Sequence, residues 1–398
     1  MSFSKLGLSD PILKAVAELG YKTPTTIQTQ SIPVVLEGKS LIAAAQTGTG
    51  KTASFVLPIL DRLSQGTTQK KKRFRALILV PTRELAIQVQ KSIVQYGQHL
   101  GLTSLAMYGG VDYQPQKQAL IDGVDIVVAT PGRLIDLYGQ HAIYFEEAET
   151  LVLDEADRML DMGFIEDINK IIARLPNDIQ NLLFSATMSN PVRELARSAI
   201  HDPVEISIAK HSASKSNIKQ WLVTVDKDKK SALLSQLLTE NSWPQVLIFI
   251  ETKHGAAKLV SQLEKRGIAA EAFHSGRNQA SRARVFEEFK NGSVKYLVAT
   301  GVAARGLDID ELPCVINYDL PYPADEYVHR IGRTGRADAQ GEAVSLVSKD
   351  NFKNLCMIES RLGHLIERRV IDGFVPKKEV PISVLNYVPK HKREQTDQ

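Results

Sequence analysis

Leu151-Val152-Leu153-Asp154-Glu155-Ala156-Asp157 is the stretch that decides the fold, because it joins an apolar run to a cluster of carboxylates. Consecutive apolar residues without alternation are typical of a strand that is buried on both faces, as in a parallel sheet. Asp154 stands where that strand ends, so its carboxylate is placed to hold a metal ion, partly through water. Glu155 is placed to orient or deprotonate an attacking water molecule.

A glycine-rich segment earlier in the chain, Ala45-Gln46-Thr47-Gly48-Thr49-Gly50-Lys51-Thr52, has the pattern of a phosphate loop, with Ala45 in place of the usual first glycine. Such a loop opens a helix, whose N–H groups and dipole favour bound phosphate. Lys51 is placed to reach the outer phosphates, and the Thr52 hydroxyl to ligate Mg²⁺. Together the two segments predict a site that binds and hydrolyses a nucleoside triphosphate with Mg²⁺.

The bulk composition is that of a globular protein with room for two domains. The 398 residues are 43% hydrophobic and 24% charged, and the net charge of +4 permits nucleic-acid binding without requiring it. Cys314 and Cys356 lie in apolar contexts, so we expect buried thiols in a reducing cytosol. We expect a cytoplasmic protein with no membrane span, because no apolar run approaches the ~20 residues that a span requires.

Short runs of Val, Ile and Leu alternate with helix-length amphipathic stretches, which predicts α/β folding with parallel sheets covered on both faces. Most of the candidate motifs follow such runs, where ligands gather in these sheets. The predicted strands are Leu41–Ala45, Ala76–Val80, Asp125–Ala129, Leu151–Asp154, Leu182–Ser185, Val204–Ile208, Trp221–Val225, Val246–Ile250, Ala269–Phe273, Lys295–Thr300, Val315–Tyr318 and Ala343–Val347.

The pattern also predicts where the chain divides. Residues 209–217 lack apolar periodicity and are expected to be a linker. Before this linker, the pattern predicts an amino-terminal segment at 1–30 and a nucleotide-binding domain at 31–208. A second domain is expected at 218–372 and a mildly basic, flexible tail at 373–398. Only the first half holds a phosphate loop, so the second half is expected to complete the site across a cleft.

Further segments occur in the order that one known family shows. Asp154-Glu155-Ala156-Asp157 resembles the signature of the DEAD-box RNA helicases, and Gly20–Gln28 resembles their Q motif. The short tail favours the bacterial RhlE-type branch. The resemblance implies two tandem RecA-like domains, each a mainly parallel sheet flanked by helices, which close on ATP and RNA across an inter-domain cleft. The other matching segments are Pro81–Ala86, Gly109-Gly110, Thr130–Arg133, Ser185–Thr187, Gln279–Arg282, Ala303–Asp308 and His329–Arg336.

Adenine recognition is expected in the amino-terminal segment. Gln28 carries an amide that can pair with the adenine edge, and Phe3 and Tyr21 are flat side chains suited to stacking. From the residues alone, Tyr21 is more often a core aromatic, and Phe3 is also consistent with an anchor for the first helix. The resemblance favours nucleotide contacts for all three. It adds Asp308 to the loop residues, so that the expected set also includes Gln46, Thr47, Gly48, Thr49, Gly50, Lys51 and Thr52.

Arg333 and Arg336 are three residues apart and can point towards one target, which leaves open whether they are surface arginines or act on a substrate. The resemblance implies that both reach the γ-phosphate from the second domain and join Lys51, Asp154 and Glu155 in catalysis. It also implies that a further set of residues couples the nucleotide site to closure. That set is Asp157, Ser185, Thr187, His329 and Arg330.

Contacts with RNA are expected mainly at sugar and phosphate, because an enzyme that acts on many duplexes cannot depend on reading bases. For Arg83 and Arg133 a structural role, each holding an acidic neighbour, stays open. The preference for RNA over DNA comes from the family alone. The expected RNA-binding residues are Pro81, Thr82, Arg83, Gly109, Gly110, Thr130, Arg133, Gln279, Arg282 and Thr300.

Gly301 departs from the family pattern, since many relatives carry aspartate there. We expect activity to survive this change. The expected function is an ATP-dependent RNA helicase that unwinds short duplexes and remodels RNA or RNA–protein complexes, with ribosome-assembly or RNA-decay proteins implied as partners by the family only. Two alternatives stay open: a DNA-directed helicase of the same superfamily, and an ATP-gated RNA-binding clamp or scaffold.

Overall fold

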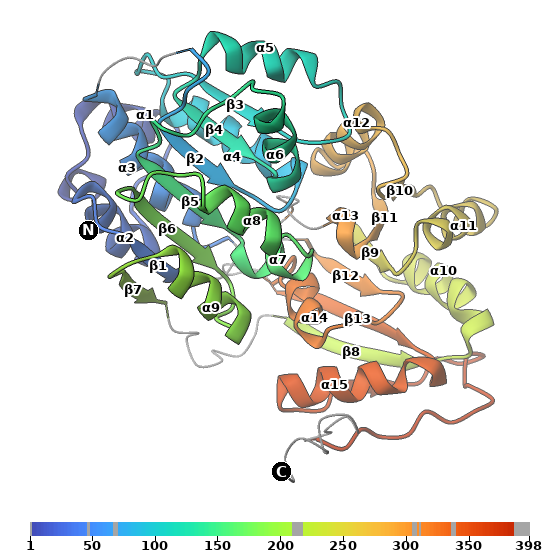
Figure 1. Ribbon diagram of the computed structural model, residues 1–398. Coiled ribbons are helices and arrows are strands. Elements are labelled where there is room, and N and C mark those ends of the chain that lie inside the picture. The colour runs from blue at the N-terminus through green and yellow to red at the C-terminus, as the bar shows by residue number, and fades with distance from the viewer. Residues whose placement is uncertain are drawn as a thin grey trace. The chain divides into compact units, whose positions relative to one another are not determined.

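The computed structural model describes residues 2–45, 48–66, 71–208, 218–304, 309, 312–335 and 340–385. The chain divides into two compact units, Met1–Ser212 and Ala213–Gln398, which are coloured along the chain in Figure 1. Several predicted features lie outside the described residues. These are Gln46, Thr47, Asp308, Arg336, the linker at 209–217 and the part of the tail from residue 386.

The first unit is built on a parallel sheet of seven strands in the order β3-β4-β2-β5-β6-β1-β7. Because β6 lies between β1 and β5, the carboxyl ends of these three strands are neighbours at one edge of the sheet. The strands are β1 (Leu41–Ala44), β2 (Ala76–Leu79), β3 (Ser104–Met107), β4 (Ile126–Ala129), β5 (Thr150–Asp154), β6 (Gln180–Ser185) and β7 (Val204–Ser207).

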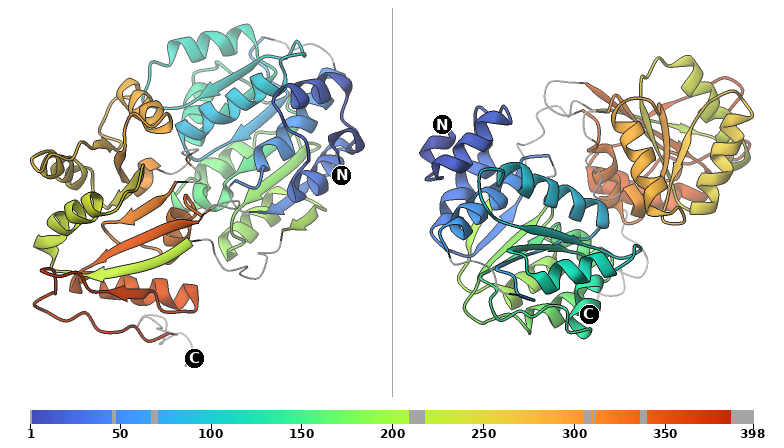
Figure 2. Two further views of the ribbon diagram at one scale, coloured as in Figure 1. Left: turned by 180° about the vertical axis from the view of Figure 1, so that it is seen from behind. Right: turned by 90° about the horizontal axis from the view of Figure 1, so that it is seen from above.

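Helices cover both faces of this sheet, as Figure 2 shows. Side chains alternate along a strand, so Ile78 of β2 packs with the residues of α1–α4 while Leu77 packs with those of α5–α9. Burial on both faces explains why these strands are continuous apolar runs. The helices are α1 (Asp10–Glu18), α2 (Thr26–Leu36), α3 (Lys51–Ser64), α4 (Arg83–Tyr96), α5 (Gln114–Asp122), α6 (Pro131–Gly139), α7 (Ala156–Asp161), α8 (Ile165–Ile172) and α9 (Asn190–Ala199), with the 3-10 turn η1 (Phe3–Lys5).

The second unit has the same construction, with a parallel sheet in the order β10-β11-β9-β12-β13-β8-β14. Its strands are β8 (Ile218–Thr224), β9 (Val246–Ile250), β10 (Glu271–Phe273), β11 (Tyr296–Thr300), β12 (Cys314–Asn317), β13 (Gly341–Val347) and β14 (Glu367–Arg369). Its helices are α10 (Lys230–Glu240), α11 (Lys253–Glu264), α12 (Gln279–Lys290), α13 (Gly301–Ala304), α14 (Ala324–Ile331) and α15 (Phe352–Leu362), with the 3-10 turns η2 (Lys227–Lys229) and η3 (Lys349–Asn351). The predicted α/β class, a parallel sheet flanked by helices in each half, is confirmed.

Two strands, β3 and β14, were not predicted from the sequence, and both lie at an end of their sheet. Most of β3 is only partly buried, so it lacks a long apolar run. The three residues of β14 are all charged: Arg368 pairs with Glu359 at 3.0 Å, and the Arg369 guanidinium lies 4.4 Å from the centre of the Trp221 ring. An edge strand can form with little apolar surface, and β3 and β14, unlike the edge strands β7 and β10, were not marked by an apolar run.

Cys314 and Cys356 are both free and buried. Of the helices that the structure describes, none combines the length and the apolar character needed to cross a membrane.

The core of the first unit predicts a large effect for one substitution. Phe184 of β6 is fully buried and its ring centre lies 5.1 Å from that of Phe55. Phe184→Ala should destabilise the unit by about 3–5 kcal/mol and lower its melting temperature by roughly 10 °C in calorimetry. Val94→Ala, at a side chain that is 55% exposed, is the control and should change stability by less than about 0.5 kcal/mol. Equal shifts for the two variants would contradict the described core.

Candidate active site and RNA-contact residues

The phosphate loop joins β1 to α3 through a turn that requires glycine. Gly50 has a φ of 87°, in the left-handed region, and a Cβ atom there would lie 2.4 Å from Nε2 of Gln28. Glycine alone meets both conditions without strain. Because α3 begins at Lys51, its first N–H groups stand just beyond the end of β1. This is the position in which a helix binds phosphate.

Gln28 ties the amino-terminal segment to this loop. Its Nε2 donates to the Gly50 carbonyl at 3.2 Å, and its Oε1 accepts from the Thr25 N–H at 2.9 Å. The Thr25 side chain in turn caps α2, so that the two residues form a capping box. These bonds leave the amide one further N–H and one further lone pair. The predicted adenine contact of Gln28 is therefore compatible with its structural role.

The two predicted stacking residues differ in exposure. Tyr21 is 50% exposed, and its hydroxyl lies 3.4 Å from that of Tyr96. Phe3 is buried in the core of the first unit, beside α1 and α2. Phe3 thus has the position expected of an anchor for the first helix, and its contact with adenine stays a prediction.

Lys51 and Asp154 are charged groups buried at the strand ends. Among the residues that the structure describes, the Nζ atom of Lys51 has no hydrogen-bond partner. The pKa of Asp154 is raised to about 6, mainly by burial and in part by the charge of Glu155, while the charge of Lys51 opposes the shift. A buried ammonium that lacks a partner suits a phosphate oxygen, and a desolvated carboxylate suits a cation. Both residues therefore fit a nucleotide with Mg²⁺.

Glu155 stands at the junction of β5 and α7 in a strained backbone conformation. Its φ of 54° and ψ of 49° are left-handed, which for a residue other than glycine costs about 1–3 kcal/mol. Its N–H donates to Asp154 Oδ1 at 2.9 Å, and its Oε2 accepts from Arg158 Nη1 at 2.6 Å. The sequence reasoning missed Arg158, although a spacing of three on a helix is a signal for such a pair.

The predicted coupling residues of the first unit are in direct contact. Asp157 Oδ2 accepts from both the N–H and the Oγ1 of Thr187, each at 2.9 Å. The Ser185 hydroxyl donates to the Thr187 carbonyl at 2.7 Å. These bonds join the helix after β5 to the segment after β6, and the coupling role of the three residues stays a prediction.

The predicted RNA-binding segments of the first unit are brought together at the ends of β2, β3 and β4. Arg83, which follows Pro81 and Thr82, lies against Gly110, since a Cβ atom there would be 2.7 Å from Nη1 of Arg83. The Thr130 N–H donates to the Met107 carbonyl at 2.9 Å and thereby holds β4 to the segment that leads to Gly109 and Gly110.

Arg133 is tied to its own unit. Its guanidinium donates to Gln116 Oε1 at 3.2 Å and to the Val111 carbonyl at 3.3 Å, and Nε lies 3.8 Å from Asp136. The Nε of Arg83 similarly lies 3.9 Å from Glu84. A structural role for these arginines requires an acidic neighbour, and both arginines have one. Their contact with RNA stays a prediction.

The second unit places its candidate RNA residues near neighbouring strand ends. Gln279 begins α12, and the buried Arg282 guanidinium lies 5.0 Å from the centre of the Phe273 ring at the end of β10. Thr300 is buried at the end of the adjacent β11. Arg282 and Thr300 are thus held at the ends of neighbouring strands, and their contact with RNA stays a prediction.

The helix α14 carries the candidate coupling residues His329 and Arg330, and Arg333 follows it. Arg330 Nη1 donates to the Asp319 carbonyl at 2.9 Å, and its guanidinium lies 4.8 Å from the centre of the Phe249 ring. Arg333 is buried, and its carbonyl accepts from the Leu312 N–H at 3.0 Å. His329 is partly exposed.

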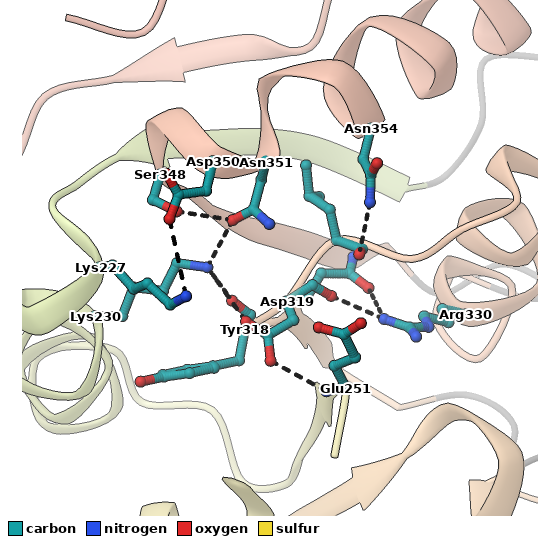
Figure 3. Close-up of polar contacts among 12 residues, drawn as sticks. Lys227, Lys230, Glu251, Tyr318, Asp319, Arg330, Ser348, Asp350, Asn351 and Asn354 are labelled. Carbon is teal, nitrogen blue, oxygen red and sulfur yellow. Dashed lines mark hydrogen bonds and ion pairs between the residues drawn. The ribbon is translucent and has the colours of Figure 1, made fainter. Parts of the chain in front are cut away.

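The loop that holds Arg330 is itself fastened by a buried lysine, as Figure 3 shows. Lys230 Nζ donates to the Tyr318 carbonyl at 2.7 Å and to Asn351 Oδ1 at 3.1 Å, and it lies 3.4 Å from Asp319. Burial lowers the pKa of Lys230, while Asp319 opposes the shift. The sequence reasoning missed Lys230, since nothing in its local context distinguishes it from a surface lysine.

A glycine turn that opens α3 beyond β1, a carboxylate pair at the end of β5 and a second unit of the same construction are features of helicase-type nucleotide hydrolases. The model of the DEAD/DEAH box helicase domain matches residues 25–195, and that of the helicase conserved C-terminal domain matches residues 229–338. The chain belongs to the DEAD-box helicase family.

Curated relatives and solved structures agree with this assignment. The chain is 42% identical to the DEAD-box ATP-dependent RNA helicase CshA of Bacillus cereus. The match extends over 367 residues and covers 92% of this chain and 69% of that protein. It is 41% identical to the RNA helicase CrhR of Synechocystis, over 92% of this chain and 74% of that protein. The solved structure of S. cerevisiae Dbp5 bound to RNA and ADP BeF3 is similar with a TM-score of 0.82 and 32% identity, over 94% of this chain and 95% of that one. Each unit is accordingly RecA-like.

The buried carboxylate of Asp154 yields a prediction about stability. Its pKa is raised from 3.8 to about 6, so the stability it contributes is fully present below pH 4 and is lost as the pH rises through 6. At pH 7.5, Asp154→Asn should raise the melting temperature of the nucleotide-free protein by about 2–4 °C for each kcal/mol recovered, because it removes the buried charge and keeps an oxygen for the Glu155 N–H.

Thermal unfolding of the two proteins without nucleotide or Mg²⁺, at pH 7.5 and pH 5, measures this effect. The difference between them should shrink at pH 5, where the wild-type carboxyl is largely protonated. Asp372→Asn, at an exposed carboxylate, is the control and should leave the melting temperature unchanged. A lower melting temperature for Asp154→Asn at pH 7.5 would show that the charge stabilises the fold.

Proposed function

We propose that this protein is an ATP-dependent RNA helicase that locally separates short RNA duplexes and remodels RNA or RNA–protein complexes. The observation that carries the proposal is the position of Lys51 at the start of α3, beyond β1, and of Asp154 and Glu155 at the end of β5, with β6 alone between the two strands of a DEAD-box helicase fold. The similarity to Dbp5, which was solved with RNA and ADP BeF3, supports ATP and RNA as the ligands.

In the proposed reaction, Lys51 would bind the outer phosphates, and Thr52 and Asp154 would hold Mg²⁺, in part through water. When bound, Mg²⁺ neutralises charge on the phosphate oxygens. A water oxygen attacks the γ-phosphorus, the bond to the bridging oxygen of ADP breaks, and Glu155 orients the water or accepts its proton. The ion pair with Arg158 holds the Glu155 carboxylate in one orientation.

Closure of the two units is the proposed link between this reaction and RNA. Arg333 and Arg336 would stabilise the charge on the transferred phosphoryl group from the second unit, where Asp308 is proposed to contact the ribose or to act in closure. Bonds such as that between Asp157 and Thr187 would transmit the state of the nucleotide to the RNA-contact segments. Bound RNA would then be bent at its sugar-phosphate backbone, and phosphate release would reopen the clamp.

Finer assignments stay proposals. The RhlE-type branch is one of them, since the relatives reported above carry the names CshA and CrhR. The division into residues 1–30, 31–208, 209–217, 218–372 and 373–398 is another. A cytoplasmic location is supported by two buried free thiols, and ribosome-assembly or RNA-decay proteins are partners by family likeness alone.

Strand displacement tests the proposal. Purified protein with ATP and Mg²⁺ should separate a short RNA duplex and leave the matched DNA duplex intact, and single-stranded RNA should stimulate hydrolysis more than DNA does. Equal action on DNA would favour the DNA-directed alternative. ATP-dependent RNA binding without strand separation would favour the clamp or scaffold.

Glu155→Gln separates binding from hydrolysis. The amide preserves the shape of the side chain but cannot accept the proton of the attacking water, so turnover should fall by a factor of ~10² or more. ATP-dependent RNA binding, measured by fluorescence anisotropy, should persist. Glu166→Gln, at an exposed carboxylate of α8, is the matched control and should hydrolyse ATP normally. Loss of RNA binding together with hydrolysis would assign Glu155 a structural role.

Gln28 should set the choice of nucleotide. ATP should support RNA-dependent activity while GTP, CTP and UTP support little, and Gln28→Ala should weaken ATP binding and reduce the preference for ATP over GTP. Thr25→Ala is the matched control, because it removes the helix cap, at a cost of about 1 kcal/mol, and keeps the amide. If Thr25→Ala changed nucleotide preference as much as Gln28→Ala does, the effect would come from the capping box and not from adenine recognition.

A further inference from the structure

Gly301, the departure from the family pattern, lies against two charged side chains. It follows Thr300 directly and begins α13. A Cβ atom at this position would lie 3.0 Å from Nη2 of Arg330 and 3.3 Å from Oε1 of Glu326. Both distances are shorter than ordinary van der Waals contact. A side chain at 301 would therefore require Arg330 or Glu326 to move. A glycine at 301 leaves both side chains where they are.

Glu326 and Arg330 are one helical turn apart on α14, and both are more than 90% buried. Oε1 of Glu326 lies 3.7 Å from Nε of Arg330. Residues four apart on a helix face the same way, which accounts for the contact. A buried cation is costly unless a carboxylate or comparable group compensates its charge. Glu326 supplies that charge to Arg330.

Arg330 also contacts uncharged groups. One is the Asp319 carbonyl at 2.9 Å and another is the Phe249 ring at 4.8 Å. In Figure 3, Asp319 extends its side chain towards Glu251, whose N–H it accepts at 3.1 Å, and towards Lys230. The Asp319 carboxylate is thus engaged elsewhere, and only its backbone oxygen is bonded to Arg330.

We propose that Glu326 is a positioning residue for Arg330 and supplies, from α14, the carboxylate beside the guanidinium that a glycine at position 301 cannot supply. A carboxylate at position 301 would crowd that of Glu326, because Oε1 of Glu326 is 3.3 Å from the Cβ position of residue 301. The absence of a side chain at 301 therefore leaves room for the carboxylate of Glu326 beside Arg330. The inference rests on the proposed function, because Arg330 is assigned there to coupling.

A double-mutant cycle on the full chain tests this inference. Glu326→Ala should reduce RNA strand displacement at least fivefold at saturating ATP and RNA, measured well below its melting temperature, while KM for ATP changes less than threefold. Gly301→Asp alone should also reduce activity, because two carboxylates crowd one guanidinium. The variant that combines both changes should exceed Glu326→Ala and approach the wild type within threefold.

Each outcome either supports the positioning role of Glu326 or overturns it. A fall of less than fivefold for Glu326→Ala, or a combined variant no more active than Glu326→Ala, overturns the inference. A purely structural glutamate would lower the melting temperature and leave the activity of the folded protein unchanged. If Glu326→Ala does not fold, Glu326→Gln, which keeps the volume and removes the charge, replaces it in the cycle.

Two further measurements complete the test. Asp325→Asn is the matched control, since the neighbouring carboxylate is half exposed and pairs with Arg361 at 2.6 Å on the surface; its strand displacement should equal that of the wild type. The melting temperatures of the same four proteins report the coupling between positions 301 and 326 without any activity. If wild-type protein displaced no strand, the proposed function would fail, and these temperatures would still decide whether the two carboxylates substitute for each other.

Discussion

The parallel arrangement of the strands is the constraint on which the rest of the first unit depends. It brings the carboxyl ends of β1, β6 and β5 to one edge in that order, so the phosphate loop, Ser185 and Asp154 become neighbours. Helices on both faces then bury these ends and exclude water from charged groups. The chemistry proposed for the site follows from that burial, since a bound nucleotide with Mg²⁺ would compensate the charges of Lys51 and Asp154 where solvent does not.

The same burial lowers the stability of the first unit at the nucleotide site. Asp154 is ionised at neutral pH against a raised pKa, and Glu155 occupies a left-handed backbone conformation. Such strain persists only where the surrounding structure determines it. Here the surroundings include the bonds from Asp157 to Thr187 and from Arg158 to Glu155. A nucleotide with Mg²⁺ would relieve part of the electrostatic cost, which links binding to the stability of this unit.

Cations of the second unit are held in a different way. Arg330 and Lys230 are buried, but carbonyl groups, carboxylates and aromatic rings within the unit surround them. The loop at 318–320 lies between these two cations and is fixed by both (Figure 3). Glu326 and Gly301 belong to the same arrangement, because the space that the glycine leaves is the space that the Arg330–Glu326 pair occupies.

Local patterns in the sequence were sufficient for the α/β class, most of the strands and the phosphate-loop and carboxylate motifs, because burial on both faces produces continuous apolar runs and glycine marks the turn at position 50. They did not reveal β3 and β14, whose edge positions require little apolar surface. Only the tertiary structure decided the contacts between distant residues, such as Gln28 with Gly50, Asp157 with Thr187 and Glu326 with Gly301. These contacts depend on the order of strands in the sheet and on how helices pack against it, and no periodicity along the chain encodes that order.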